Sequence, residues 1–226
     1  MLVLCKKQIW GVIMYEYLLF DLDGTLTDPA EGITNSVAYA LDKFGIEVED
    51  KRTLYKFIGP PLVDAFSEYY GFSKEDSEKA TAFYRETFRV KGLFENRVYD
   101  GVYDMLETLK SKGKKLIIAT SKPEEFTMRI LEHFDLLKYF DFVAAATFDA
   151  SRNSKDKVIT YALEHLKIKD LSKVVMIGDR HHDIDGAIVN GIDSIGVLWG
   201  FGSREELTVA GATYIAENIS HLIDKF

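Results

Sequence analysis

The chain has 226 residues and a formal net charge of −8, with 47% hydrophobic and 28% charged residues. This composition is typical of a globular protein whose core needs no disulfides, and it excludes a disordered chain. The acidic excess argues against a nucleic-acid partner bound through the overall field. The single cysteine, Cys5, excludes an internal disulfide and a cysteine-based zinc site, and it fits the reducing cytoplasm.

Residues 1–13 form an apolar stretch that Lys6 and Lys7 interrupt. The stretch is too short and too charged to span a bilayer, and no cleavage site of small residues follows it. We interpret the stretch as an N-terminal extension of doubtful status, or as the result of a start codon assigned too early, in which case Met14 is the true first residue. We favour both interpretations over an anchor at a membrane interface. We therefore expect no membrane partner.

Short apolar runs bounded by turn residues predict strands that are buried on both faces of a sheet. The runs are 17–20, 115–119, 142–146, 174–177 and 194–197. Apolar residues recur at helical intervals between them, at 102–109, 126–134 and 158–166. This alternation predicts an α/β fold with a doubly wound, parallel, Rossmann-like sheet.

The segment 29–100 interrupts the alternation with helical patterns and no buried-strand run. Two of these patterns end at Gly45 and Gly71, as helices often do, because glycine adopts the left-handed conformation of a helix end easily. A third begins at Ser73, whose hydroxyl suits the first position of a helix. The segment is therefore predicted to be all helical.

We expect residues 29–100 to form a helical cap domain inserted into an α/β core domain of residues 14–28 and 101–226. An insertion at the carboxyl end of the first strand lies over the crevice where such sheets bind ligands. The cap would close over the core about hinges near 28–30 and 99–101.

Two carboxylates, Asp21 and Asp23, directly follow the first predicted strand. At this position they leave the sheet into the crevice, where Asp21 suits a nucleophile and Asp23 suits a general acid and base. Gly24 permits the sharp turn that follows. The alternative is an ordinary acidic turn, because Asp-Gly is common in turns; we favour the catalytic interpretation.

Four further polar residues lie at ends of predicted elements: Thr120, Lys155, Asp179 and Asp183. Taken singly, each has an ordinary explanation, such as a strand-end threonine, a solvated lysine or a helix cap. All four are expected to lie around one crevice, at the carboxyl ends of the predicted strands, and this coincidence favours a functional site.

The sequence DLDGT at 21–25 resembles the first motif of the haloacid dehalogenase superfamily of phosphatases. Thr120, Lys155 and the sequence GDRHHD at 178–183 resemble the second, third and fourth motifs, in the same order along the chain. The resemblance covers about residues 15–226. It is closest to the phosphoglycolate-phosphatase-like branch, which carries a helical cap after the first motif.

Two shorter stretches support that branch: TSKP at 120–123 resembles its TNKP, and GPP at 59–61 resembles a loop of its cap. The resemblance implies a phosphomonoester hydrolase that acts on a small phosphorylated metabolite. Asp21 would attack phosphorus and become an aspartyl phosphate, and Asp23 would serve as acid and then as base. Thr120 and Lys155 would hold and neutralise the phosphoryl group.

The resemblance also implies a Mg²⁺ ion, bound by the Asp21 carboxylate, the Asp23 backbone carbonyl and Asp179, with Asp183 acting directly or through water. It implies substrate contacts from a further set of residues: Gly24, Thr25, Ser121, Lys122 and Gly59. His181 and His182 leave a second interpretation open, because imidazoles beside carboxylates suit a transition metal. We favour Mg²⁺, since the family gives these two positions no ligand role.

The expected substrates are phosphoglycolate, a nucleoside monophosphate or a sugar phosphate, and the expected state is a monomer or homodimer. A phosphotransferase or mutase of the beta-phosphoglucomutase kind shares the motifs and the cap. A non-catalytic phospholigand-binding protein on the same fold is the alternative from another class. We favour the hydrolase over both, because Asp21, Asp23 and the other motif residues are all present.

Overall fold

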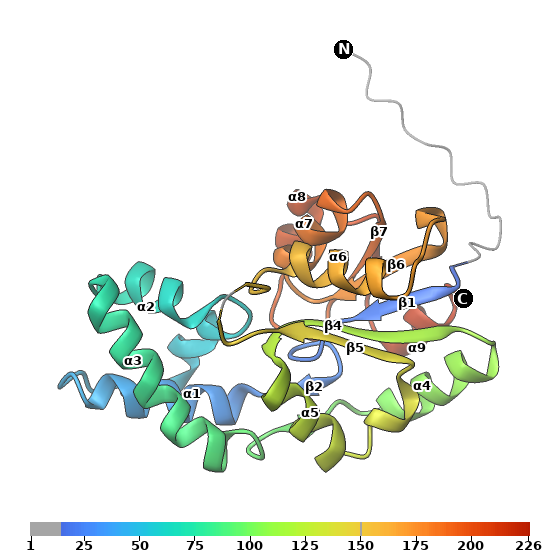
Figure 1. The fold of residues 1–226 in the computed structure, drawn as a ribbon. Coiled ribbons are helices and arrows are strands. Elements are labelled where there is room, and N and C mark those ends of the chain that lie inside the picture. Colours follow the sequence, from blue (N-terminus) through green and yellow to red (C-terminus); the bar gives the residue numbers. More distant parts are fainter. Residues whose placement is uncertain (1–14, 150) are drawn as a thin grey trace.

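The computed structural model describes residues 15–149 and 151–226, so the predicted extension at 1–13 and Cys5 lie outside the described residues. Its centre is a parallel sheet in the order β5-β4-β1-β6-β7-β8 (Figure 1). The strands are β1 (Tyr17–Phe20), β4 (Lys115–Pro123), β5 (Phe142–Ala146), β6 (Val174–Gly178), β7 (Asp193–Val197) and β8 (Tyr214–Ala216).

The position of β1 determines where the site forms. Phe20, its last residue, is in register with Ile118 of β4 and with Ile177 of β6. The chain passes from β1 to β4 on one side and reaches β6 on the other, so β1 lies at a switch point in the strand order. Parallel sheets bind ligands beyond the carboxyl ends of the strands at such a point.

The sheet confirms the predicted α/β class, with two differences. The strand expected at 115–119 continues to Pro123, because the chain stays extended through an irregularity in its pairing with β5 between Thr120 and Pro123. Such irregularities re-aim side chains beside active sites. Strand β8 was not predicted, since three residues at a sheet edge, two of them partly exposed, carry little apolar signal.

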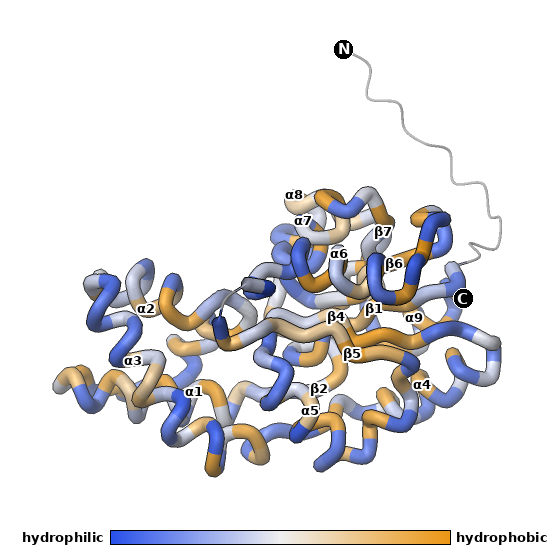
Figure 2. Tube along the Cα trace, in the orientation of Figure 1, coloured by the Kyte–Doolittle hydropathy of each residue, from blue (hydrophilic) through white to orange (hydrophobic). Residues whose placement is uncertain are grey.

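Helices cover both faces of the sheet. Leu18 and Phe20 of β1 pack with α4 (Val102–Ser111), α5 (Glu124–His133) and α9 (Ile219–Ile223). Leu19, which points the other way, packs with α6 (Lys155–His165) and α7 (His181–Val189). The remaining elements around the sheet are α8 (Arg204–Ala210) and the short helices η3 (Leu137–Tyr139) and η4 (Leu171–Lys173). Figure 2 shows the apolar residues concentrated on β4 and β5, between the helical layers.

Between β1 and α4 the chain forms the helical block, residues 29–96, which lies at one end of the sheet (Figure 1). Its elements are α1 (Ala30–Asp42), η1 (Lys51–Phe57), α2 (Leu62–Tyr70), α3 (Lys74–Thr87) and η2 (Phe88–Gly92). Gly71 ends α2 in the left-handed conformation, and the Ser73 hydroxyl accepts from the Asp76 amide at 3.1 Å to begin α3. These helix ends confirm the pattern expected from the sequence.

A two-stranded antiparallel ribbon joins the helical block to the sheet. Its strands are β2 (Thr27–Asp28) and β3 (Arg97–Val98), with Thr27 opposite Val98. The Arg97 guanidinium binds the Asp28 carboxylate at 2.7 Å across it. The sequence did not predict this ribbon, because strands of two residues have no measurable periodicity. No helix in 15–149 or 151–226 has the length and apolar character needed to cross a bilayer.

Candidate active site

The carboxyl ends of β1 and β6 bring three aspartates together. Asp21 follows β1, Asp179 follows β6, and Asp183 lies in the first turn of α7. Each offers a carboxylate oxygen, and these oxygens all lie within 4.8 Å of one another. All three side chains are buried, Asp179 completely.

Lys155 lies among these carboxylates as the first residue of α6. Its ammonium contacts Asp21 Oδ1 at 2.8 Å and Asp183 Oδ1 at 2.7 Å, and it donates to the carbonyl of Ala119 at 2.9 Å. Three acceptors match the three protons of an ammonium group. Burial lowers the pKa of Lys155, but Asp183 and Asp21 more than offset this, so the pKa is raised. Lys155 therefore stays charged and holds Asp21 in place.

Asp23 has a lysine of its own. The Lys122 ammonium forms an ion pair with Asp23 Oδ2 and lies over the ring of Phe88, 4.9 Å from its centroid. Burial raises the pKa of the Asp23 carboxyl, against the lowering effect of Lys122. A raised pKa favours the protonated form that a general acid needs. Because Phe88 begins η2, Lys122 also connects the sheet to the helical block.

The three clustered carboxylates fit a hard divalent cation. Oδ1 of Asp179 is buried and has no hydrogen-bond partner among the described residues. Burial and its two acidic neighbours raise the pKa of Asp179 well above its usual range, and burial raises that of Asp183 to about 6. Positive charge beyond that of Lys155 would favour the ionised form of these crowded carboxylates, and an all-oxygen donor set is the kind that Mg²⁺ prefers.

Three glycines pack closely around Asp179, where no side chain would fit. A Cβ on Gly24 would lie 2.3 Å from Asp179 Oδ2, one on Gly200 2.4 Å from the same oxygen, and one on Gly202 1.9 Å from the Asp179 carbonyl oxygen. The Phe201 amide donates to Asp179 Oδ2 at 2.8 Å. The loop after β7 therefore orients this carboxylate, a role that our sequence reasoning missed although the alternating glycines of WGFG at 199–202 were a visible signal.

Arg180, also missed, connects the sheet side of the site to the helical block. Its backbone amide donates to Asp183 Oδ2 at 3.1 Å, which begins α7. Its guanidinium donates from Nη1 to the carbonyl of Ile58 at 2.7 Å and from Nε to Glu206 at 2.9 Å. One residue thus contacts an acidic residue of the site and the backbone just before the GPP loop.

A cavity of about 380 Å³ lies between the sheet and the helical block. From the sheet side, the sequence-predicted residues that line it are Asp21, Asp23, Thr120, Ser121, Lys122, Lys155 and Asp183. From the helical block, Gly59 and its two prolines line it, as the sequence suggested, together with Tyr84, Arg85 and Phe88, which were not singled out. The sequence signal for these three was only an ordinary helical pattern, which the structure divides between α3 (Tyr84 and Arg85) and η2 (Phe88).

Three predicted residues lie behind the cavity rather than on its wall. Gly24, Thr25 and Asp179 are not among the lining residues. Gly24 has φ +84° in the turn that follows Asp23, and it packs against Asp179. The Thr25 carbonyl accepts a hydrogen bond from the Trp199 indole at 3.0 Å. These residues shape the backbone of the site.

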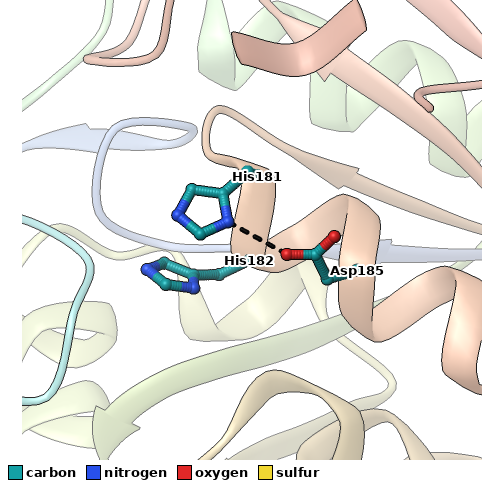
Figure 3. Close-up of side chains that lie close together, drawn as sticks. All are labelled: His181, His182 and Asp185. Atoms are coloured by element: carbon teal, nitrogen blue, oxygen red, sulfur yellow. Dashed lines mark hydrogen bonds and ion pairs between the residues drawn. The ribbon is translucent and has the colours of Figure 1, made fainter. Parts of the chain in front are cut away.

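The two histidines group with an acidic residue outside the buried cluster. His181, His182 and Asp185, all of α7, offer ligand atoms within 4.8 Å of one another (Figure 3). Burial lowers the pKa of His182 to about 4, so its ring is neutral at pH 7. The geometry therefore associates the imidazoles with Asp185, and the all-oxygen cluster stands apart from them.

Comparison with known proteins assigns the chain to a family. The model of the haloacid dehalogenase-like hydrolase family matches residues 18–197, and the chain belongs to this family. It is 43% identical over 212 residues to a protein of Pseudomonas aeruginosa named 5'-nucleotidase, covering 94% of this chain and 96% of the other. It is 37% identical over 200 residues to the tyrosine-protein kinase PtkA of Mycobacterium tuberculosis, covering 88% and 68%.

Solved structures agree on the fold. The crystal structure of a predicted phosphatase from Clostridium acetobutylicum superposes with a TM-score of 0.91 at 52% identity, covering 94% of this chain and 98% of that one. With the family match and the named relatives, this similarity defines the protein as a phosphatase of the haloacid dehalogenase type.

Proposed function

We propose that the protein is a Mg²⁺-dependent phosphomonoester hydrolase of the cytoplasm, acting on a small phosphorylated metabolite as a monomer or homodimer. The observation that carries the proposal is the pair Asp21 and Asp23, which line one cavity while separate lysines hold their carboxylates. Two neighbouring carboxyl groups with different charged partners can take different roles, one as nucleophile and one as acid.

In the first half of the reaction, an Asp21 carboxylate oxygen attacks phosphorus and the ester P–O bond breaks. The Asp23 carboxylic acid gives its proton to the leaving oxygen. In the second half, the Asp23 carboxylate takes a proton from water, whose oxygen attacks phosphorus. The P–O bond to Asp21 breaks, inorganic phosphate leaves, and both aspartates return to their starting states.

Asp21, Asp179, Asp183 and the Asp23 carbonyl would hold Mg²⁺, with water in the remaining positions. When bound, the ion supplies positive charge that offsets the repulsion between carboxylate and phosphate. Thr120 and Ser121 line the cavity, and the Thr120 hydroxyl and the Ser121 backbone amide would bind phosphoryl oxygens. Gly24 and Thr25 would contribute to substrate binding through the backbone of the turn that follows Asp23.

The cavity wall favours an aromatic leaving group among the expected substrates. Phe88 packs against Phe126 at 5.4 Å between ring centroids, and Phe126 against Phe148 at 5.3 Å. The Arg85 guanidinium lies over Phe148 at 5.1 Å. A nucleobase can stack on such a wall, whereas phosphoglycolate has no ring to place there. The name 5'-nucleotidase of the Pseudomonas aeruginosa relative supports a nucleoside monophosphate.

The test is phosphate release in Mg²⁺ from nucleoside monophosphates, phosphoglycolate, hexose phosphates and phosphotyrosine. We expect nucleoside monophosphates to be hydrolysed with the highest kcat/KM. Preference for phosphoglycolate would contradict the aromatic assignment but retain the hydrolase. Absence of phosphate release from every compound would contradict the hydrolase.

The phosphotransferase alternative has one observation in its favour, the similarity to a protein named tyrosine-protein kinase. The acceptor hydroxyl, instead of water, would then attack the phosphorus of the same aspartyl phosphate, and the P–O bond to Asp21 would break as the phosphoryl group is transferred. Mass spectrometry of acceptors added to the assay separates the two: a phosphorylated acceptor formed faster than inorganic phosphate would favour transfer.

A further inference from the structure

His181, His182 and Asp185 form a cluster that the proposed reaction does not use. All three lie in the first two turns of α7 and project to the same side (Figure 3). His181 Nδ1 lies 2.9 Å from Asp185 Oδ2, and the two imidazole rings are 3.8 Å apart between centroids. We propose that this cluster is a second metal site, one that binds a transition-metal dication such as Zn²⁺.

The spacing along the helix suits chelation. Residues four apart lie one above the other on a helix, so His181 and Asp185 reach toward one point. Two ligands bound at about 2.1 Å in a tetrahedral arrangement are roughly 3.4 Å apart, by the geometry of zinc sites. The observed 2.9 Å between His181 Nδ1 and Asp185 Oδ2 needs to open by only a few tenths of an ångström.

His182 is available as the third ligand. Among the side-chain hydrogen bonds of residues 15–149 and 151–226, none involves a ring nitrogen of His182. All the ligand atoms of the cluster lie within 4.8 Å of one another. An ion can therefore replace the single His181–Asp185 hydrogen bond and give the His182 ring a partner.

The donor set determines which ion the cluster prefers. Two imidazoles and one carboxylate suit Zn²⁺, Co²⁺, Ni²⁺ and Cu²⁺, whereas Mg²⁺ prefers oxygen donors only. The buried cluster of Asp21, Asp179 and Asp183 has the opposite preference. The N-terminus of α7 and the nearby Arg180 both disfavour a cation, but each is weaker than three direct ligands.

The position gives such an ion a consequence for the cavity. His182 lines the main cavity and also a second cavity of about 250 Å³, whose wall includes Asp185 and Gly59. Three protein ligands leave at least one coordination position for water or an anionic oxygen. An ion bound here therefore adds an exchangeable position beside the cavity.

The test is Co²⁺ titration of untagged, metal-free protein at pH 7 in millimolar Mg²⁺, which occupies the all-oxygen cluster. Co²⁺ is followed by its visible absorption and Zn²⁺ by calorimetry. We expect one equivalent to bind, with affinity at least tenfold weaker in His181→Gln and in Asp185→Asn. Both side chains are partly exposed, so these variants should fold, as circular dichroism will check.

Three control variants locate the ion. His165→Gln, which alters a histidine stacked on Phe142, should bind like the unchanged protein, and so should Cys5→Ser. Asp21→Asn should also retain binding. Binding lost in Asp21→Asn but kept in His181→Gln would place the ion on the carboxylates and overturn the proposal, and so would no binding in the presence of Mg²⁺. Because the measurement is of binding, it does not depend on the proposed hydrolase activity.

Discussion

The Arg180 side chain donates from Nη1 to the backbone carbonyl of Ile58 at 2.7 Å, across the boundary between the sheet and the helical block. The same guanidinium binds Glu206, and the backbone of Arg180 binds Asp183. Contact with the helical block is thus linked, through one residue, to a carboxylate of the site.

Arg180→Lys should lower kcat/KM about tenfold, because a lysine cannot donate to Ile58 and Glu206 in the same geometry, and a charged hydrogen bond contributes about 1.5–3 kcal/mol. The measurement is steady-state kinetics together with amide hydrogen exchange of Ile58 and Gly59, which should become faster. Arg204→Lys alters an exposed ion pair with Glu217 and is the matched control. Equal effects of the two substitutions would contradict a specific role for Arg180.

Asp21→Asn should abolish turnover and leave the fold intact, because the amide is a poor nucleophile of nearly the same shape. Phosphate release and circular dichroism measure the two effects. Asp104→Asn, on an exposed position of α4, should keep full activity. Residual activity of Asp21→Asn above about one per cent, relative to the large losses expected for a nucleophile, would contradict its assignment.

Chelation with EDTA should remove activity, and Mg²⁺ but not Zn²⁺ should restore it, because the buried cluster offers only oxygen donors. Asp179→Asn should raise the Mg²⁺ concentration needed for half activity more than tenfold, an effect measured by Mg²⁺ titration. Asp224→Asn, on an exposed residue near the C-terminus, should leave it unchanged. Strong activation by Zn²⁺ would contradict the assignment of Mg²⁺ to this site.

Gly24→Ala should weaken Mg²⁺ binding and destabilise the protein, because its Cβ would overlap Asp179 Oδ2 and its φ is +84°. Gly191→Ala is the matched control: its φ is +67°, but the space around it is open. It should cost about 1–2 kcal/mol, the strain of the left-handed conformation alone. Calorimetry with Mg²⁺ and thermal unfolding test both; equal losses in the two variants would contradict the packing argument.

The stability of the metal-free protein should fall as pH decreases from 6.5 toward 4, in part because of His182. Its pKa is lowered to about 4 in the folded state, so in this window the unfolded chain takes up a proton that the folded protein does not. His182→Gln removes this difference and should make the decline shallower. Urea unfolding at pH 7, 6 and 5 measures it, and parallel pH profiles of the two proteins would contradict it.

Much of the fold could be predicted from the sequence, because strands such as 17–20 and 142–146 are continuous apolar runs and some helices, such as α3, begin at a capping side chain. Several expected site residues come together because they lie at the ends of predictable elements, as Asp21 and Asp179 do, whereas Thr120 lies inside β4. Their catalytic roles stay predictions until the variants above are measured.

Other features depend on long-range packing; of these, only the glycines at 200 and 202 left a local signal, and that signal does not say which residue they pack against. The Trp199–Gly202 loop packs on Asp179 through backbone contacts, and Arg180 meets Ile58 over a separation of more than one hundred residues. The aromatic wall combines Phe88 of the helical block with Phe126 and Phe148 from the sheet side. Such contacts depend on how distant segments pack, and a periodic pattern in one segment does not encode them.

The antiparallel ribbon of Thr27–Asp28 and Arg97–Val98 has a consequence for how the protein family can diversify. The two chain crossings lie side by side, so the segment between them begins and ends at nearly the same point. Lengthening or replacing such a segment changes the cost of closing it only slowly with length. Evolution can therefore replace the segment 29–96 while Asp21 and Asp23 stay unchanged on the sheet side. Such a replacement would change which substrates fit the cavity.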